Sequence, residues 1–342
     1  MTSIVMSQET FNRLRELIYT RSGLEFPESK KYLLESRLRS RLAAVHCRTF
    51  EEYYHFLRFD PQREQEFTEL FNCITTNETF FFRDMAQLDC FRHMILPQII
   101  KEREKTKSLR IWSAGCSSGE EPYTLAMIIM EEFPALTGWD VRILGTDISE
   151  HMLQAAERGV YGPYAVRHIP PRYLRKYFTG SEGQYTIDPM LRRLVKFSVL
   201  NLFDSMRMRT IREIDIIFCR NVLIYFDQEA RKRIVTDFYH ALRDPGVFVI
   251  GFSESLNGIN RLFRPMPWNK TIVYYKASAM PAPSMTVAGS SNHRIPQSVN
   301  GSAPAIQVTH QGSGQRSSLA PSGTESHPVS AGRMWKRKEG VP

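Results

Sequence analysis

Apolar residues recur every three or four positions through the first quarter of the chain, which is the spacing of one face of an α-helix. The pattern covers four segments with short links between them, namely residues 7–21, 29–46, a segment that begins at Thr49, and 61–74. Glu52 follows Thr49 by three positions, the capping-box arrangement at the start of a helix. Amphipathic helices with short links pack into a bundle, so we expect an all-α N-terminal domain over residues 1–76.

Residues 77–105 are expected to connect this domain to the next one. They begin within the motif ITTNETFFFRD at 74–84, which admits two interpretations. In the first, polar residues cap helix ends and the phenylalanines pack in a core, and periodicity alone favours this interpretation. In the second, the motif crosses a ligand site, where Asn77 and Thr79 supply hydrogen bonds and Arg83 supplies a cation. The remainder, 84–105, is predicted to be helical with a kink at Pro97.

From residue 106 onward, short apolar runs end in small or polar residues and alternate with helical segments, the pattern of an α/β domain with a parallel sheet. The runs are 109–112, 141–145, 195–200, 214–219 and 246–251, and a hairpin near 262–266 and 271–275 closes the domain. Residues 160–196 interrupt the pattern with segments rich in Tyr, Pro and Arg. We therefore predict a Rossmann-like domain over 106–276 with a small β-subdomain inserted at about 160–196.

The first of these strands leads into the loop SAGCSSG at 113–119, and the next helix begins with Glu120 and Glu121. Small residues allow backbone N–H groups to approach a ligand closely, and a helix start carries partial positive charge. Two carboxylates at this start repel a pyrophosphate, so a phosphate-binding loop is disfavoured and a cationic ligand group is favoured. S-adenosylmethionine, with its sulfonium and ammonium groups, is the nucleoside cofactor that fits this expectation.

Polar residues follow the later strands at the end where an open α/β sheet has its ligand crevice. Asp147 follows the second strand, Asn201 the third, and Arg220 with Asn221 the fourth. An acidic residue at the end of the second strand binds ribose hydroxyls in such folds. The alternative makes Asp147 or Ser149 the N-cap of a helix over 150–158, and both roles can coexist.

Composition adds limits to this outline. The chain has 342 residues, of which 42% are hydrophobic, and a net charge of +9. Residues 277–342 are rich in Ser, Gly and Pro and are expected to form a disordered basic tail. The tail holds six basic and two acidic residues and so accounts for four of the nine charges, which weakens the case for a nucleic-acid-binding protein.

Five scattered cysteines without a C-x-x-C pair predict neither a disulfide framework nor a metal site. The N-terminus has no secretory signal, and no apolar run approaches the roughly 18 residues of a membrane span. We therefore expect a cytoplasmic protein with no membrane insertion.

The second predicted helix carries a cluster of basic residues among its leucines, namely Lys30, Lys31, Arg37, Arg39 and Arg41, against the single acidic Glu35. Such a charge-rich face is most often simply solvated. The alternative is a docking surface for an acidic helical partner. From the residues alone, both interpretations stay open.

Five motifs occur in order along the chain: TTNETFFFR at 75–83, SAGCSSGEEPYT at 113–124, GTDIS at 145–149, VLNLFD at 199–204 and IFCRNVLIYF at 217–226. In order and spacing this set resembles the chemotaxis receptor glutamate O-methyltransferases, the CheR family. The resemblance covers about residues 11–276. It implies an all-α domain followed by a Rossmann-like methyltransferase domain with an inserted β-subdomain, and transfer of a methyl group from S-adenosyl-L-methionine to receptor glutamates in sensory adaptation.

The resemblance also implies roles for individual residues. Cofactor contacts fall on Asn77, Thr79 and Arg83 in the linker, Glu121 at the methionine ammonium, Asp147 at the ribose, Asn201 with Leu202 at the adenine, and Arg220 with Asn221 at the methionine end. Tyr225 is implied near the transferred methyl group. The basic second helix is implied to contact the cytoplasmic helical region of the receptor.

Two features depart from the family pattern, and one of them is the predicted tail at 277–342, which lies outside the shared region. Some members dock a receptor-tail peptide on the β-subdomain through a longer, glycine-rich turn, whereas the turn at 179–183 is short. We therefore do not expect peptide docking here. As a separate expectation, we take the protein to be a monomer.

A receptor glutamate is ionised at neutral pH, since its usual pKa is about 4.3, so we expect an in-line displacement that needs no general base. Arg83 is the hypothesised anchor for a carboxylate and Tyr225 the hypothesised orienting group, which makes them the two predicted catalytic residues. An NAD-dependent dehydrogenase conflicts with the paired glutamates, and a nucleic-acid methyltransferase would need an N/D-P-P-Y type motif. A non-catalytic regulatory module conflicts with the intact Arg83, Asp147, Asn221 and Tyr225, although the sequence leaves that alternative open.

Overall fold

The computed structural model describes residues 4–180, 183–259 and 261–276. The expected tail, 277–342, and residues 181 and 182 of the short turn lie outside this described part. Within it, none of the helices combines the length and the apolar character that crossing a membrane requires.

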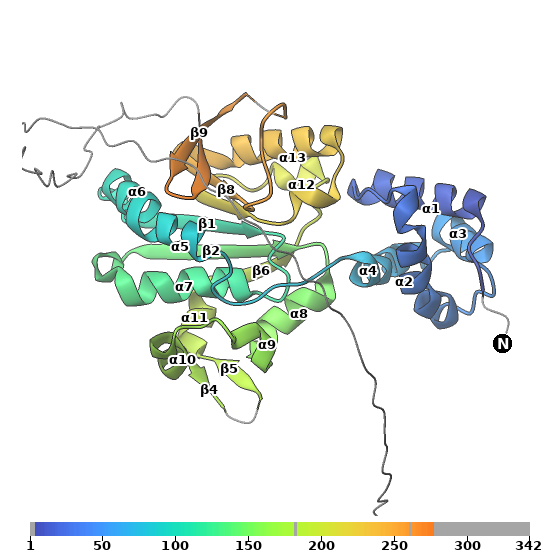
Figure 1. Cartoon of the computed structure of the whole chain (residues 1–342), viewed down its shortest axis with the longest axis horizontal. Coiled ribbons are helices and arrows are strands. Elements are labelled where there is room, and N and C mark those ends of the chain that lie inside the picture. Colours follow the sequence, from blue (N-terminus) through green and yellow to red (C-terminus); the bar gives the residue numbers. More distant parts are fainter. Residues whose placement is uncertain (1–3, 181–182, 260, 277–342) are drawn as a thin grey trace, which may run out of the picture. The chain divides into compact units, whose positions relative to one another are not determined.

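Four α-helices, drawn in blue in Figure 1, form the N-terminal domain: α1 (Gln8–Ser22), α2 (Lys31–Ala44), α3 (Phe50–Phe59) and α4 (Arg63–Ile74). Their apolar faces meet in one core. Thr49 caps α3 as predicted, because its hydroxyl accepts a hydrogen bond from the N–H of Glu52. The Glu52 carboxylate accepts from the N–H of Arg48 instead of Thr49, so the reciprocal half of the capping box is shifted by one residue.

An extended linker leads from α4 to two consecutive helices, α5 (Met85–Cys90) and α6 (Leu96–Arg103). A five-residue π-helix, Phe91–Ile95, joins them. The predicted kink at Pro97 stays a prediction, but the helix type changes from α to π in the turn before this proline. The cause is local, because a proline ring excludes the regular hydrogen bond to the carbonyl four residues before it.

The second domain is built on a seven-stranded sheet with the strand order β6-β2-β1-β7-β8-β10-β9. The first five strands in this order are parallel: β6 (Val195–Val199), β2 (Asp140–Asp147), β1 (Ser108–Ala114), β7 (Ile214–Cys219) and β8 (Leu242–Ile250). The hairpin of β9 (Phe263–Trp268) and β10 (Thr271–Lys276) adds two antiparallel strands. The strand order reverses between β1 and β7, which is the position where such sheets bind ligands.

Alternate residues of the central strands point to opposite faces of the sheet, and each face has its own core. Ile111 and Val249 belong to the core that α6 and α7 (Glu120–Glu132) cover. Trp112 and Phe248 belong to the core that α13 (Gln228–Ala241) covers. Two shorter helices complete the layers, α8 (Glu150–Arg158) beside β6 and α12 (Ser205–Met208) beside α13.

A small antiparallel sheet is inserted between α8 and β6, with the strand order β3-β5-β4. Figure 1 shows this group in green to yellow: β3 (Val160–Tyr161), α9 (Pro163–Val166), α10 (Pro171–Tyr177), β4 (Phe178–Thr179), β5 (Tyr185–Ile187) and α11 (Pro189–Leu194). The main sheet resumes at Val195, because Val195 and Lys196 pair with β2. The strand β6 of the main sheet thus begins at Val195, next to the predicted end of the insertion at about 196.

Candidate active site

The carboxyl ends of β1, β2, β6 and β7 open onto one pocket with a cavity volume of about 220 Å³, and the linker between α4 and α5 passes along it. Every residue predicted for the cofactor or for catalysis lines this pocket: Asn77, Thr79, Arg83, Glu121, Asp147, Asn201, Leu202, Arg220, Asn221 and Tyr225. Residues far apart in the chain meet here because parallel strands present their carboxyl ends at one edge of the sheet.

The structure places phenylalanines of the linker motif in a core and polar residues of the same motif at the pocket; their contacts with a ligand stay a prediction. Phe81 and Phe82 are buried in the core of the sheet domain. Thr79 and Arg83, on either side of them, line the pocket. The packing of the phenylalanines therefore holds the polar residues of the same motif at the site.

The loop after β1 approaches the neighbouring strand ends so closely that its first position requires glycine. Gly115 has a φ of +74°, and a Cβ atom there would lie 2.4 Å from Cγ2 of Val222. The N–H groups of Gly115 and Cys116 both donate to the carbonyl oxygen of Thr146. The loop thus closes onto the ends of both β2 and β7.

Asp147, at the end of β2, ties this loop to α8. Its carboxylate accepts hydrogen bonds from the N–H of Ser117 at 2.8 Å and from the N–H of Ser149 at 2.9 Å. The N-cap of α8 is Ser149, whose hydroxyl accepts from the N–H of Met152. Of the two capping residues that the sequence allowed, the structure selects Ser149. Burial raises the pKa of Asp147 above its usual range.

The paired glutamates at the start of α7 lie in different environments. Glu121 lines the pocket, and its carboxylate accepts hydrogen bonds from the Ser113 hydroxyl at 2.6 Å and the Arg220 guanidinium at 2.9 Å. Glu120 is buried, and its carboxylate accepts from the hydroxyl of Ser118. Burial raises the pKa of Glu120 to about 7. The sequence predicts that both carboxylates face the ligand, whereas only Glu121 of the two lines the pocket.

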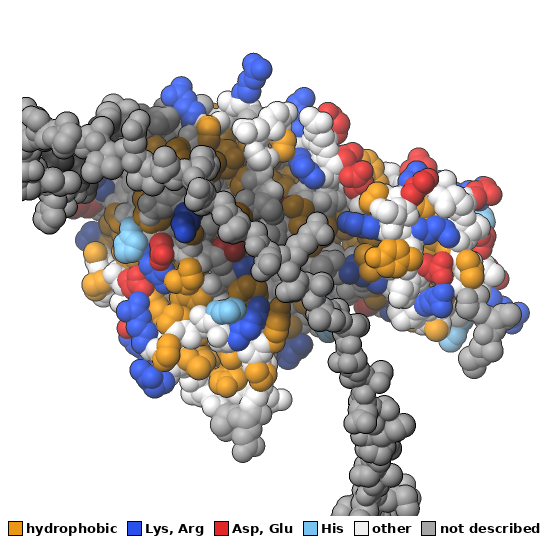
Figure 2. Space-filling model, viewed as in Figure 1, with side chains coloured by type: hydrophobic (Ala, Val, Ile, Leu, Met, Phe, Trp, Pro, Cys, Tyr) orange, Lys and Arg blue, Asp and Glu red, His pale blue; other side chains and the backbone are white. Residues whose placement is uncertain are grey.

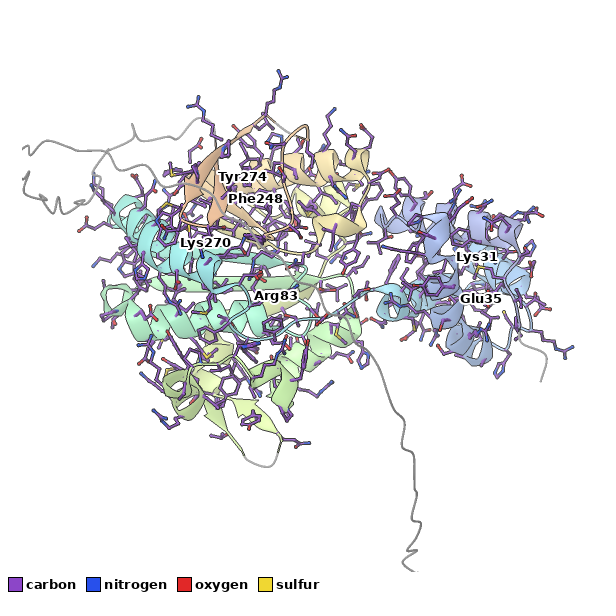
Figure 3. All side chains as sticks on the ribbon, viewed as in Figure 1. Lys31, Glu35, Arg83, Phe248, Lys270 and Tyr274 are labelled. Carbon is purple, nitrogen blue, oxygen red and sulfur yellow. The ribbon has the colours of Figure 1, made fainter. Side chains whose placement is uncertain are left out.

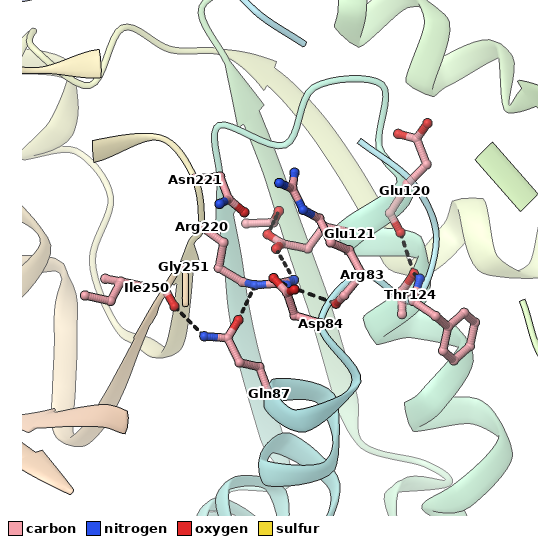
Figure 4. A network of polar contacts seen from close by, with 12 residues as sticks. Arg83, Asp84, Gln87, Glu120, Glu121, Thr124, Arg220, Asn221, Ile250 and Gly251 are labelled. Carbon is pink, nitrogen blue, oxygen red and sulfur yellow. Dashed lines mark hydrogen bonds and ion pairs between the residues drawn. The ribbon is translucent and has the colours of Figure 1, made fainter. Parts of the chain in front are cut away.

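Arg220 binds the linker to the sheet, as Figure 4 shows. Its Nε donates to Gln87 at 2.6 Å, and its Nη1 donates to Glu121. Its Nη2 donates to the Asp84 carboxylate at 2.6 Å and to the carbonyl oxygen of Arg83 at 2.9 Å. The side chain is 4% exposed, so this guanidinium is an internal link.

Two members of this network, Asp84 and Gln87, were not predicted. Both belong to a stretch whose pattern indicates an ordinary helix, and 136 residues separate Asp84 from Arg220. The sequence carries no sign of their role, because the burial of Gln87 is visible only in the structure. A buried amide needs partners, and those partners come from strands that follow much later in the chain.

Three groups at the pocket keep capacity for a ligand. Arg83 donates to the carbonyl oxygen of Glu78 at 3.1 Å and forms no ion pair with a carboxylate of the described residues. Asn221 has a φ of +60°, and its buried Oδ1 has no hydrogen-bond partner within the described part of the chain. The Tyr225 hydroxyl likewise makes no hydrogen bond to any residue that the structure describes. The site thus offers a cation, an unpaired carbonyl oxygen and a phenol.

Two other predicted cofactor residues use their side chains within the protein. The Asn201 amide donates to the carbonyl oxygen of Arg21 at 2.7 Å and accepts from the N–H of Phe203 at 3.0 Å. The Asn77 amide donates to the Thr75 hydroxyl at 3.1 Å. These side chains shape the pocket through their protein contacts.

The N-terminal domain meets the segment that follows β7. Leu24 pairs with Phe226 in an antiparallel bridge, and the Tyr19 hydroxyl donates to the Asp227 carboxylate at 2.8 Å. Lys30 and residues of the linker therefore line the same pocket as the strand ends.

Three of the five basic residues predicted for docking bind other groups of the protein. Arg37 donates to the carbonyl oxygen of Ile74, and Arg39 forms an ion pair with a residue one turn earlier on the same helix. Arg41 forms an ion pair with the buried Glu66 and is itself only 18% exposed. The ion pair with Glu66 therefore occupies Arg41 within the helical domain, and its predicted part in docking stays a prediction.

Lys30 and Lys31 form no ion pair among the described residues, and Lys30 is exposed. Figure 3 places Lys31 beside Glu35 on α2. Basic and acidic side chains alternate over the helical domain on the face that Figure 2 shows. Of the five basic residues, Lys30 and Lys31, which form no ion pair with a described residue, thus lie at the amino end of α2.

Comparison with known proteins gives a consistent result. The family described as "CheR methyltransferase, all-alpha domain" matches residues 9–75, and "CheR methyltransferase, SAM binding domain" matches residues 77–272. The chain is 36% identical over 277 residues to "Chemotaxis protein methyltransferase 2" of Vibrio cholerae, covering 81% of this chain and 96% of that protein. It is 36% identical over 270 residues to "Chemotaxis protein methyltransferase" of Borreliella burgdorferi, covering 78% and 94%.

The two family models match in the same order as the two folded domains, and the second one covers the strands whose ends form the pocket. They confirm the methyltransferase fold and the cofactor that the motifs indicated. The chain therefore belongs to the CheR methyltransferase family and is an S-adenosyl-L-methionine-dependent methyltransferase.

Proposed function

We propose that this protein transfers a methyl group from S-adenosyl-L-methionine to glutamate carboxylates of chemotaxis receptors, forming glutamate methyl esters. Family membership supports the proposal, as do relatives named chemotaxis protein methyltransferases. The observation that carries the substrate class is Arg83, a guanidinium at the pocket with no carboxylate partner among the described residues. A guanidinium binds carboxylates through two parallel hydrogen bonds.

The free groups of the pocket fit the methionine half of the cofactor. The Glu121 carboxylate and the unpaired Oδ1 of Asn221 are acceptors that would hold the ammonium group. When bound, the cofactor supplies a methyl group on a sulfonium, which a carboxylate oxygen accepts while the sulfur keeps the electron pair of the broken bond. Arg220 would fix Glu121 in place, since it donates to that carboxylate from a buried position.

The nucleoside half is assigned to the other strand ends. Asp147 would hold the ribose, in the position where Rossmann-like folds carry an acidic residue. Because the Asn201 side chain is engaged with Arg21, we assign the adenine contact to the backbone of Asn201 and to Leu202. Asn77 and Thr79 would cover the nucleoside from the linker.

Arg83 and Tyr225 have the proposed catalytic roles. The incoming glutamate is ionised at neutral pH, so no residue has to remove a proton from it. Arg83 anchors one side of the carboxylate and thereby directs an oxygen toward the methyl group. The phenol of Tyr225 orients the groups that meet there. Catalysis then rests on alignment in a site that excludes water.

The receptor is proposed to dock through the amino end of α2, where Lys30 and Lys31 form no ion pair with any residue that the structure describes. A receptor segment that carries several glutamates is acidic and complements these charges. We further propose that the protein acts as a monomer in the cytoplasm, where the helical region of the receptors lies.

The proposal is tested by incubating the full-length protein with methyl-labelled S-adenosylmethionine and membranes that contain chemotaxis receptors. We expect label on the receptors that mild alkali releases, as it does from a carboxyl methyl ester, and we expect S-adenosylhomocysteine to suppress the labelling. Binding of S-adenosylhomocysteine without alkali-labile label on any receptor would contradict the glutamate assignment.

A further inference from the structure

The pairing of β7 with β8 ends at the edge of the pocket. The last paired residues of the two strands are Cys219 and Ile250. Beyond them the chain turns sharply on both strands, with Asn221 at a φ of +60° on one and Gly251 on the other. The backbone N–H groups at these turns have no carbonyl of the neighbouring strand to bind.

A single carboxylate, that of Glu254, accepts hydrogen bonds from four of these N–H groups. Its Oε2 accepts from Gly251 at 2.6 Å and Asn221 at 2.9 Å. Its Oε1 accepts from Val222 at 3.1 Å and Ile224 at 3.3 Å. The Glu254 carboxylate therefore continues the connection between the two strands past the point where their own pairing stops.

The backbone around this carboxylate leaves no spare room. A Cβ atom at Gly251 would lie 2.6 Å from Oε2 of Glu254 and 2.8 Å from the nitrogen of Asn221. The N–H of Glu254 donates to the carbonyl oxygen of Gly251 at 3.0 Å, which closes the turn that carries the carboxylate. Glycine at 251 is thus the residue that allows the carboxylate to reach the turn after β7.

The segment held in this way carries two of the pocket groups that have no partner within the described residues, the Oδ1 of Asn221 and the hydroxyl of Tyr225. Glu254 does not line the pocket. We propose that Glu254 is a positioning residue, which fixes the backbone of 221–224 and so sets Asn221 and Tyr225 for the methionine end of the cofactor. The assignment of that end of the pocket rests on the proposed function.

The chemistry of the acceptor makes the role specific to a carboxylate. Glutamine has nearly the same shape, but it offers one oxygen, and its NH₂ group would face N–H donors. At least one pair of backbone N–H groups then loses its acceptor, and hydrogen bonds to a charged group are the stronger kind. Aspartate keeps two oxygens but is one methylene shorter, so it reaches part of the set.

The test compares Glu254→Gln with Glu254→Asp, and uses Glu102→Gln as the matched control. Glu102 is an exposed glutamate on α6 and does not line the pocket. Calorimetric titration measures the Kd of S-adenosylhomocysteine at a temperature where circular dichroism finds each variant folded. We expect the Kd of Glu254→Gln to rise about tenfold or more, Glu254→Asp to fall between it and the wild type, and the control to stay within about twofold.

A second readout separates positioning from stability. The KM for receptor is expected to stay within about twofold of wild type in folded Glu254→Gln, while the KM for S-adenosylmethionine rises. A lower melting temperature with an unchanged Kd and an unchanged KM for the cofactor would mean that Glu254 serves stability alone, and would overturn the proposal.

If the variants fail to fold, the proposal can still be tested on the wild type. Hydrogen exchange on the cofactor-free wild type then reports on the amides of residues 221, 222, 224 and 251, which we expect to be protected before any ligand binds. Rapid exchange of all four would overturn it. A wild type that binds S-adenosylhomocysteine but methylates no receptor would contradict the proposed function only, because the binding measurement still decides the role of Glu254.

Discussion

Arg83 and Arg220 lie at one pocket with opposite hydrogen-bonding states. All three nitrogens of Arg220 donate within the protein, to Gln87, Glu121 and Asp84. Arg83 donates to one carbonyl oxygen and is free of ion pairs with the described residues. A buried guanidinium whose donors are occupied supports the structure, whereas one with open donors is available to a substrate. The two arginines should therefore fail in different ways when they are removed.

Arg83→Ala is expected to lower the rate of receptor methylation by about 100-fold, because the carboxylate loses its two-point anchor. Its free energy of unfolding should change by less than about 1 kcal/mol. Arg220→Ala should instead lower the free energy of unfolding by about 3 kcal/mol or more, since it leaves Glu121 without its buried cation. Initial methylation rates and urea unfolding of both variants check the contrast. Wild-type activity in Arg83→Ala would rule out the anchoring role.

Glu120 gives the protein a pH-dependent stability. Burial raises its pKa from 4.5 to about 7 in the folded protein, so the folded state favours the protonated carboxyl. The folded state binds this proton more tightly than the unfolded state, and stability is therefore lost as pH rises from about 4.5 through about 7.

Glu120→Gln should remove this dependence while keeping an oxygen for the Ser118 hydroxyl. We expect the stability of the wild type relative to Glu120→Gln to fall by up to about 3 kcal/mol between pH 5 and pH 8. Urea unfolding at several pH values measures the difference, with Glu102→Gln as a control that should show no such trend. A pH-independent difference for Glu120→Gln would show that Glu120 is charged throughout.

At the scale of elements, the parts of the fold that depend on neighbours in sequence were predictable. The strand, small-residue loop and helix from β1 to α7 follow directly from 109–129, and Thr49 caps the helix that its position indicates. The pattern also indicated the parallel strands and their polar ends.

The rest depends on contacts between distant segments. The sequence cannot pair Arg220 with Gln87 across 133 residues, nor Glu254 with the turn after β7. The sequence also cannot tell which of Glu120 and Glu121 is buried and which lines the pocket. The two side chains are neighbours at the start of α7 and point in different directions, and the orientation of the helix on the sheet decides which one meets the pocket. For the same reason the sequence could not show which of the five basic residues of the second helix bind within the protein. Glu66, the partner of Arg41, lies on another helix.

Two glycines, one in the loop after β1 and one just before β2, offer a matched pair of substitutions. Gly115 and Gly138 both have positive φ, +74° and +83°, but a Cβ atom meets Val222 at 2.4 Å in the first and nothing within 4 Å in the second. Both alanine variants should lose about 1 kcal/mol of stability from backbone strain. Gly115→Ala should lose about 1–3 kcal/mol more and bind S-adenosylhomocysteine more weakly, because Val222 and the loop have to move apart. Thermal unfolding and calorimetric titration measure both effects, and equal behaviour of the two variants would contradict the close-approach argument.

At the scale of the whole molecule, the pocket is shared by two domains with separate cores. The helical domain has its own apolar core, and the two faces of the sheet have theirs. The contacts of Tyr19 with Asp227 and of Leu24 with Phe226 connect the domains beside Tyr225. A receptor helix held at the amino end of α2 would therefore have its glutamate close to the strand ends, since Lys30 is itself part of the pocket lining.

Lys31→Glu tests this docking without touching the pocket, because Lys31 is not among the lining residues. The reversal should raise the KM for receptor about tenfold at low ionic strength, since it replaces attraction to an acidic helix with repulsion. A negative charge at Lys31, the first residue of α2, suits the helix dipole but also repels Glu35 one turn on, so circular dichroism first checks that the variant is folded.

The control is Lys270→Glu, the same charge change at an exposed lysine in the turn between β9 and β10 (Figure 3). If docking depends on net charge alone, both variants raise the KM for receptor equally, and the proposal for α2 is wrong. If docking depends on α2, only Lys31→Glu changes, its Kd for S-adenosylhomocysteine stays at the wild-type value, and the difference from wild type shrinks as salt is added because an exposed charge is screened. Steady-state methylation of receptor membranes at two salt concentrations distinguishes these outcomes.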